Sequence, residues 1–158
     1  MSIEKAYNIW ANQYDTNNNK TRDLDVKATV ETLSKYSFDS VLELGCGTGK
    51  NTEWLLTKAK QVIGLDFSEE MLNIAKAKIS DPRVEFKRTD LNKKWEIENQ
   101  FADLVTSSLT LEHIADLNPV FNQAHQKLNN NGLFFISELH PFKQYAGSKA
   151  RYETETGT

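Results

Sequence analysis

The sequence predicts a doubly wound α/β fold, with a mainly parallel sheet of about five strands, helices on both faces and a helical cap at the N-terminus. From residue 40 onward, short apolar runs alternate with amphipathic stretches of helical period. The apolar runs show no polar alternation, which is typical of parallel strands buried on both faces. Crossovers between such strands are right-handed, and a doubly wound layout follows.

The first 37 residues do not follow this alternation. An aromatic-rich helix is predicted over residues 6–14, a polar loop over 16–20 and a second helix over 24–33. We therefore divide the chain into an N-terminal helical lid segment, residues 1–37, and one α/β domain, residues 38–158.

The remaining elements follow in order along the chain. Strands are predicted at residues 40–44, 61–65, 84–86, 101–107 and 133–136. Helices are predicted at residues 48–59, 69–79 and 117–128, the second of them capped by Ser68. The Asn129-Asn-Asn-Gly132 segment is predicted to be a turn.

The composition of the chain argues against several classes of protein. A chain of 158 residues with 39% hydrophobic content suits one domain. Its net charge of -3 disfavours a nucleic-acid substrate. The single cysteine cannot form an internal disulfide, and no apolar run reaches membrane-spanning length. We expect a soluble, cytoplasmic protein without membrane association, and we assign no metal site.

The strongest chemical signal is the segment from Val41 to Gly49, VLELGCGTG, in which a strand runs into three alternating glycines. Such a bend brings the main chain close to a ligand beyond the carboxyl end of a strand. The third glycine departs from the G-x-G-x-x-G spacing of dinucleotide sites. Glu43 would repel a pyrophosphate and attract a cation such as S-adenosylmethionine. A plain strand-to-helix turn is the alternative.

Acids follow the next two strands. Asp66 lies 21 positions after Gly45, a separation suited to binding ribose hydroxyls, although a helix-capping role would also explain it. Phe67 and Met71 follow, and either could pack on an adenine or in the core. Asp90 comes after the third strand, where it could accept from an exocyclic amino group or cap a loop.

Taken together, these segments resemble the successive motifs of class I S-adenosylmethionine-dependent methyltransferases, which have a Rossmann-like fold. The segments are ELGCGTG, LDFSEEML, RTDL and FADLVTSSLTLEHI, and the resemblance covers about residues 5–145. It implies S-adenosyl-L-methionine as the cofactor and a small molecule as the methyl acceptor.

The resemblance also implies roles for single residues. The methionine end of the cofactor would lie against the backbone of Gly45, Cys46 and Gly47, near Glu43 and the carbonyl of Ser107. The adenosine end would meet Asp66, Phe67, Met71, Asp90 and the backbone nitrogen of Leu91. Ser108 and Leu111 would begin the wall facing the acceptor. Tyr7, Trp10 and Tyr14 resemble the opening of small-molecule members, where a helix covers the site; plain packing would also explain them.

No catalytic base is required if the acceptor is a carboxylate, whereas a hydroxyl or a carbon acid needs one. The candidates are His113, Glu112, His140 and Tyr14, and we favour His140 with Tyr14. The N/D-P-P-Y/F tetrad of enzymes that methylate base amino groups is absent after the fourth strand, where Ser107-Ser-Leu-Thr110 stands. An O- or C-directed transfer to a carboxylate or acyl-thioester acid is expected.

The sequence shows no apolar strand after Ile136, whereas family members continue with further strands. We expect a C-terminally truncated domain whose fifth strand is an open edge, covered by residues 139–158 or paired in a homodimer. A non-catalytic module that binds the cofactor or a partner protein is the alternative function.

Overall fold

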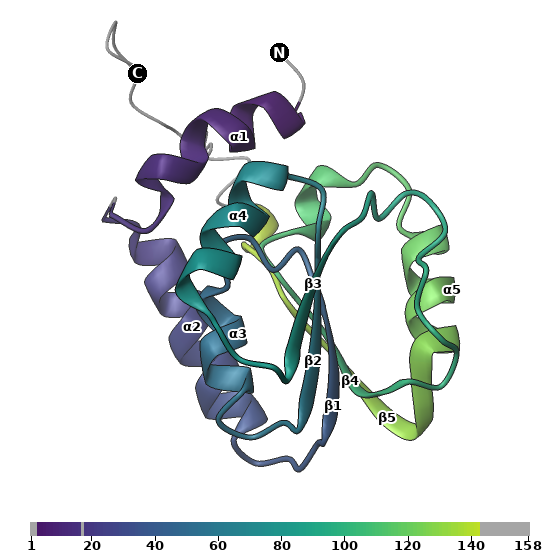
Figure 1. Cartoon of the computed structure of the whole chain (residues 1–158). Helices are drawn as coiled ribbons and strands as arrows, with labels where there is room; N and C mark the ends of the chain where they lie inside the picture. The colour runs from purple at the N-terminus through teal and green to yellow at the C-terminus, as the bar shows by residue number, and fades with distance from the viewer. Residues whose placement is uncertain (1–2, 17, 143–158) are drawn as a thin grey trace, which may run out of the picture.

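A five-stranded sheet, all of it parallel, forms the centre of the molecule (Figure 1). The computed structural model describes residues 3–16 and 18–142. The strands are β1 (Ser40–Leu44), β2 (Gln61–Asp66), β3 (Val84–Arg88), β4 (Ala102–Ser108) and β5 (Leu128–Ser137). Their order across the sheet is β3-β2-β1-β4-β5. The predicted doubly wound, Rossmann-like fold is confirmed.

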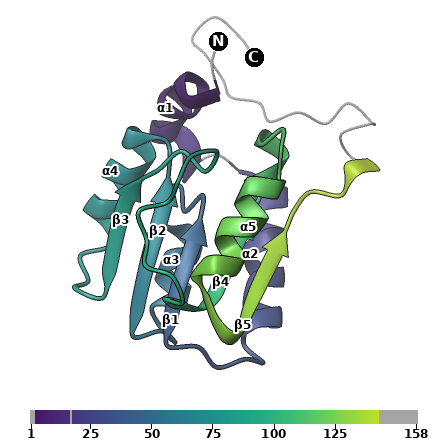
Figure 2. The ribbon, with the colours of Figure 1, turned by 90° about the vertical axis from the view of Figure 1, so that its right-hand side faces the viewer.

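Helices cover both faces of this sheet (Figure 2). They are α1 (Ile3–Tyr14), α2 (Lys20–Leu33), α3 (Lys50–Leu55), α4 (Glu69–Lys78), α5 (Asn118–Lys127) and the short 3-10 helix η1 (Leu111–His113). Figure 2 shows α5 in front of β4 and β5, with α2 and α3 behind the sheet. Each face therefore has its own apolar core, as the near-continuous apolar strands predict.

The two cores are built from alternate residues of the same strands. Val41, Val62 and Leu104 pack with Leu33 and Leu55 beneath α2 and α3. The opposite core is formed by Leu42, Leu44, Ile63, Leu65, Val105, Trp95, Val120 and Ala124, beneath α5 and the loop before β4. Burial on both faces fixes the register of the central strands.

Several predicted boundaries were wrong. α2 begins at Lys20 rather than at residue 24, because the Asn19 side chain accepts from the Arg22 amide and starts the helix earlier. α3 covers only Lys50–Leu55 of the predicted 48–59. It starts later because Gly49 is in the left-handed region and cannot belong to the helix, and residues 56–58 form a turn after its end.

The predicted turn at residues 129–132 is instead the first part of β5. The pairing with β4 is irregular there, and Asn131 has a φ of 64°. Asn129 donates to the Asp103 carboxylate of β4 at 2.8 Å. The asparagines therefore form an irregular stretch within the strand, which the local turn signal of the sequence cannot distinguish from a loop.

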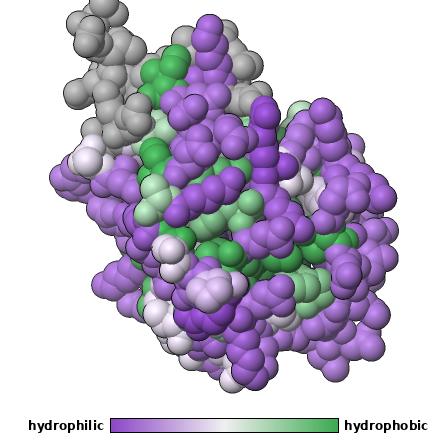
Figure 3. Space-filling model, in the orientation of Figure 1, coloured by the Kyte–Doolittle hydropathy of each residue, from purple (hydrophilic) through white to green (hydrophobic). Residues whose placement is uncertain are grey.

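β5 lies at one edge of the sheet, as expected from the sequence. The residues proposed to cover this edge fall mostly in 143–158, outside the described part of the chain. The face seen in Figure 3 is mainly hydrophilic, with hydrophobic atoms confined to narrow strips between polar side chains. Among the described helices, none combines the length and apolar character needed to cross a bilayer.

Candidate functional site

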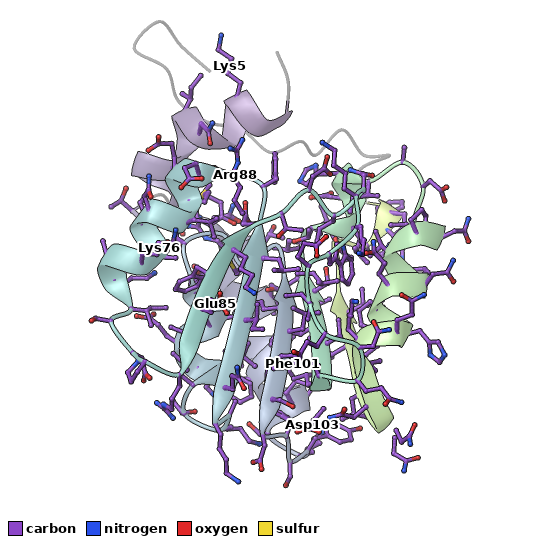
Figure 4. All side chains as sticks on the ribbon, turned by 45° about the vertical axis from the view of Figure 1, so that its right-hand side comes forward. Lys5, Lys76, Glu85, Arg88, Phe101 and Asp103 are labelled. Carbon is purple, nitrogen blue, oxygen red and sulfur yellow. The ribbon has the colours of Figure 1, made fainter. Side chains whose placement is uncertain are left out.

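A cavity of about 270 Å³ opens where β1 to β4 end. Its walls come from segments far apart in the sequence: Tyr14, Gly45, Gly47, Asp66, Phe67, Met71, Asp90, Leu91, Asn92, Ser108, Leu109, Thr110, His113 and Ile114. Figure 4 shows Arg88, the last residue of β3, at this end of the sheet below α1, and Asp103 at the opposite end. The cavity thus lies at the carboxyl ends of the strands, where open α/β sheets bind ligands.

A smaller cavity, of about 40 Å³, adjoins the first one. Tyr14, Gly45 and Gly47 line both cavities, together with Ser108 and Leu109. The other walls of the smaller cavity are polar or charged to a large extent: Arg22, Asp25, Glu43, Thr48, Lys50 and Asn51, with Val26 and Cys46. The two spaces together can hold a ligand with a nucleoside part and a small charged part.

The glycine bend adopts the conformation that its sequence predicts. Gly45, Gly47 and Gly49 have φ values of 70°, 53° and 82°. The amides of Gly45 and Cys46 donate to the Leu65 carbonyl at 2.7 and 3.0 Å, which ties the bend to the end of β2. A Cβ on Gly45 would collide with Thr110, whereas a Cβ on Gly47 would meet open space. The Gly47 backbone is therefore directly accessible to a ligand.

Asp66 ends β2 and lines the larger cavity. Its carboxylate accepts from the amides of Gly47 and Ser68, both at 2.9 Å. Burial raises the pKa of this carboxyl, although these backbone donors oppose the shift. Asp66 thus links the glycine bend to the start of α4 and presents an acceptor at the cavity wall. Ser68, not Asp66, is the N-cap of α4.

Glu43 lies in the smaller cavity and is 5% exposed. The Thr52 hydroxyl donates to its Oε2 at 2.5 Å. Burial raises the pKa of Glu43 to about 8, and the charges of Asp66 and Asp25 add to this effect. The structure differs here from the expectation of an ionised acid, because near neutral pH the ligand-free carboxyl is mainly protonated.

The predicted adenosine-side residues all line the larger cavity. Phe67, Met71 and Leu91 supply apolar surface to the larger cavity, and Asp90 lies beside them. The Asp90 carboxylate accepts from the amide and side chain of Asn92, which lowers its pKa. This part of the lining thus combines three apolar residues, of which Met71 and Leu91 are buried, with an ionised acid.

Among the predicted cofactor-binding residues and the favoured catalytic residues, Ser107 and His140 line neither cavity. Ser107 is fully buried inside β4, between Leu44 of β1 and Ile136 of β5. His140 is exposed, and its Nδ1 accepts from the Phe142 amide. The structure instead brings His113, the alternative imidazole, to the larger cavity. Its Nε2 lies 3.7 Å from Glu112.

The N-terminal helices α1 and α2 contribute residues to the lining of the site. Tyr14 lines both cavities, its ring lies 4.4 Å from the Arg22 guanidinium, and burial raises the pKa of its hydroxyl. The side chains of Tyr7 and Trp10 lie outside the described residues, so their expected lid role stays a prediction.

Sequence reasoning missed Arg22, Asp25, Asn92 and Thr110 as wall residues. It placed Leu111 on the wall, but this side chain packs in the core beneath α5. The signal for Arg22 and Asp25 was absent from the sequence, because only the packing of α2 against α3 brings them to the glycine bend. Asn92 follows Asp90 closely and could have been included with it.

Comparison with known proteins points to one family. The family model described as "Methyltransferase domain" matches residues 42–136. Malonyl-[acyl-carrier protein] O-methyltransferase of Bacillus anthracis is 29% identical, over 98% of this chain and 61% of the relative. This chain thus spans less than two thirds of that relative's length.

Solved structures of methyltransferases are also similar to this chain. An S-adenosylmethionine-dependent methyltransferase from Mesorhizobium loti is 33% identical, with a TM-score of 0.64 over 72% of this chain and 55% of that chain. The DhpI–SAM–HEP complex has a TM-score of 0.78 over 98% of this chain and 76% of that chain. At 23% identity, that second likeness concerns the fold alone.

Proposed function

This chain belongs to the class I S-adenosylmethionine-dependent methyltransferases, and on that premise we propose that it transfers the cofactor's methyl group to a small molecule. The main support for this proposal is the pair of adjoining cavities, which are lined by the glycine bend, Asp66 and Asp90. The open space in front of Gly47 fits a ligand that approaches the main chain closely. When bound, the cofactor supplies an electrophilic methyl group on its sulfonium.

In this proposal the larger cavity takes the adenosine. Asp66 accepts from the ribose hydroxyls, and Phe67 and Met71 flank the adenine. Asp90 accepts from the adenine amino group, beside the amide of Leu91. Support comes from the presence of all five residues in the lining of one cavity and from the lowered pKa of Asp90.

The smaller cavity takes the methionine end. The backbone of Gly45, Cys46 and Gly47 lies along it, and Glu43 faces the ammonium group. Arg22, which lines the same space, would provide a counter-charge for the carboxylate. A cation favours the ionised form of Glu43, so the ligand would itself lower the raised pKa of this carboxyl.

For the acceptor, we propose a carboxylate or an acyl-thioester acid. The support is the name of the Bacillus anthracis relative, a malonyl-[acyl-carrier protein] O-methyltransferase. Such an oxygen nucleophile needs no general base, so the protein's contribution is alignment and the exclusion of water. The wall from Ser108 to Ile114, which carries His113, lies where the acceptor would enter. His140 and Tyr14 stay catalytic candidates.

Calorimetry tests cofactor binding directly. We expect S-adenosylhomocysteine to bind and NAD not to bind. Asp66→Asn should weaken S-adenosylhomocysteine binding at least about tenfold, because the ribose loses a charged acceptor. Asp116→Asn is the matched control, since this exposed carboxylate accepts from the Asn118 amide away from both cavities.

Transfer is then measured with methyl-labelled S-adenosylmethionine and malonyl-coenzyme A, followed by a library of carboxylic and hydroxylated metabolites. Label in an acceptor establishes the enzyme. Cofactor binding without any label transfer would favour a non-catalytic module, and absence of cofactor binding would overturn the proposal.

A further inference from the structure

The segment after β4, residues 109–114, forms one wall of the larger cavity and is held from outside itself. Leu109 has a φ of 52°, in the left-handed region that a branched side chain adopts at a cost of about 1 kcal/mol or more. η1 begins next, and its N-cap Thr110 makes no side-chain capping bond. The first amides of a helix need acceptors from elsewhere. Something outside this segment must therefore stabilise it.

Glu138, just past the end of β5, provides those acceptors. Its Oε1 accepts from the amides of Thr110 and Leu111 at 3.0 and 2.9 Å. The preceding Ser137 carbonyl accepts from the Leu109 amide at 2.8 Å. Three consecutive amides of the wall are thus bonded to two consecutive residues of another strand.

The residues that Glu138 holds, and those that follow them, lie at the larger cavity. Thr110 lies directly against Gly45, where a Cβ would be only 2.1 Å from its Oγ1. His113 follows within η1, and Ile114 follows η1; both line the larger cavity. The position of this wall relative to the glycine bend therefore depends on the contact between Glu138 and the start of η1.

We propose that Glu138 is a positioning residue, which holds the start of η1 so that Thr110 and His113 face the cofactor cavity in a fixed geometry. This inference rests on the proposed function only for its effect on ligand binding. Its effect on the wall itself is independent of what the cavity binds.

The chain offers a sharp pair of variants. Glu138→Ala removes the acceptor of both amides. Glu138→Gln keeps an oxygen in the place of Oε1, while Oε2 has no hydrogen-bond partner in the described part of the chain, so no bond is lost there. Glu96→Ala is the control, because this carboxylate is 83% exposed on a loop away from the cavities.

Two measurements report on the structure of residues 109–114 without any ligand. In Glu138→Ala, the amides of Thr110 and Leu111 should exchange hydrogen at least about tenfold faster, since each loses its bond. The chain has 3 histidines, so the His113 imidazole can be followed by NMR with His125 as the internal reference, since His140 is only two residues from Glu138. The His113 resonance should move in Glu138→Ala, while that of His125 stays. Glu138→Gln should restore both readouts to nearly wild-type values.

Ligand binding is the third readout. S-adenosylhomocysteine should bind about tenfold more weakly to Glu138→Ala and within about threefold of wild type to Glu138→Gln. Unchanged amide exchange and an unchanged His113 resonance in Glu138→Ala would overturn the inference. Rapid exchange of the Thr110 and Leu111 amides in the wild type would also overturn it, and that test needs no variant. If the wild type binds no S-adenosylhomocysteine, the proposed function fails while the first two readouts still decide the role of Glu138.

Discussion

Glu43 shows how strongly burial can change the pKa of a single residue. Desolvation inside the smaller cavity raises its pKa from 4.5 to about 8. Between these two pH values the folded protein holds a proton that the unfolded chain has released. The free energy of unfolding therefore falls as pH rises through this window.

Glu43→Gln should remove this pH-dependent loss. The amide keeps an acceptor for the Thr52 hydroxyl and carries no charge. We expect the variant to be more stable than wild type at pH 8, on the order of 3 kcal/mol, and nearly equal to it at pH 5. Urea unfolding at the two pH values measures the difference. An equal effect of the substitution at both values would show that Glu43 titrates normally.

Gly47 is the residue at which a side chain would compete most directly with a ligand. It combines a φ of 53° with open space where a Cβ would stand. Gly47→Ala should cost about 1 kcal/mol of stability through backbone strain and weaken S-adenosylhomocysteine binding at least about tenfold.

Asn131→Ala is the control for Gly47→Ala, because Asn131 has a similar φ of 64° in β5 and lines neither cavity. Calorimetry should find its affinity unchanged. Equal losses of affinity in the two variants would mean that strain, and not occupation of the cavity, is responsible.

At the scale of elements, one carboxylate at the end of α1 connects this helix to two other parts of the chain. Asp15, just after the helix, accepts from the Thr48 hydroxyl at 2.7 Å and from the Lys78 ammonium at 3.0 Å. Burial opposes ionisation of Asp15, but these two donors outweigh it and lower its pKa. One carboxylate thus joins the end of α1 to the glycine bend and to α4.

Asp15→Ala should loosen α1. Because the carboxylate is partly exposed, we expect a loss of about 1 kcal/mol, with hydrogen exchange in α1 and the dissociation of S-adenosylhomocysteine each about fivefold faster. Stopped-flow dissociation measures the second effect. Glu31→Ala, on the exposed face of α2, should leave both rates unchanged. A wild-type dissociation rate in Asp15→Ala would contradict the idea that the contacts of Asp15 keep α1 in place.

Asp103 stabilises the opposite end of the sheet. It accepts from the amides of Asp39 and Ser40 at 2.9 and 3.0 Å and from the Asn129 side chain at 2.8 Å. Asp103→Ala should lower the free energy of unfolding by about 2–3 kcal/mol, since backbone donors lose a charged acceptor. Affinity of the folded protein for S-adenosylhomocysteine should not change, because Asp103 lies far from the cavities (Figure 4). A loss of affinity would couple the two ends of the sheet.

The elements that the sequence predicted well are those fixed by local patterns. The strand at 40–44 with its glycine bend, and the helix capped by Ser68, follow from periodicity and from the special conformations of glycine. The errors arose where distant residues decide. Asn129 belongs to a strand because it bonds to Asp103, and His113 reaches the cavity because Glu138 holds η1. Neither partner is near in sequence, so no local pattern could indicate the result.

For the molecule as a whole, acids with a raised pKa concentrate at the end of the sheet that carries the cavities. Asp25, Glu43, Asp66 and Glu138 all have a raised pKa, chiefly because of burial. Asp25 and Glu43 line the smaller cavity, and Asp66 lines the larger one. Each raised pKa costs stability at higher pH, a cost typical of functional sites. A cation bound among these acids would offset that cost.

Cofactor binding should therefore release protons. S-adenosylmethionine is cationic at its sulfonium and ammonium groups, so its binding favours ionised Glu43, whose pKa of about 8 then falls. At pH 7 up to about one proton should leave the protein, and affinity should rise with pH until about pH 8 and then level off. Calorimetry in two buffers of different ionisation enthalpy measures the release. Glu43→Gln should abolish most of it, and a wild-type binding enthalpy that is the same in both buffers would show that no acid in the cavities changes its protonation on binding.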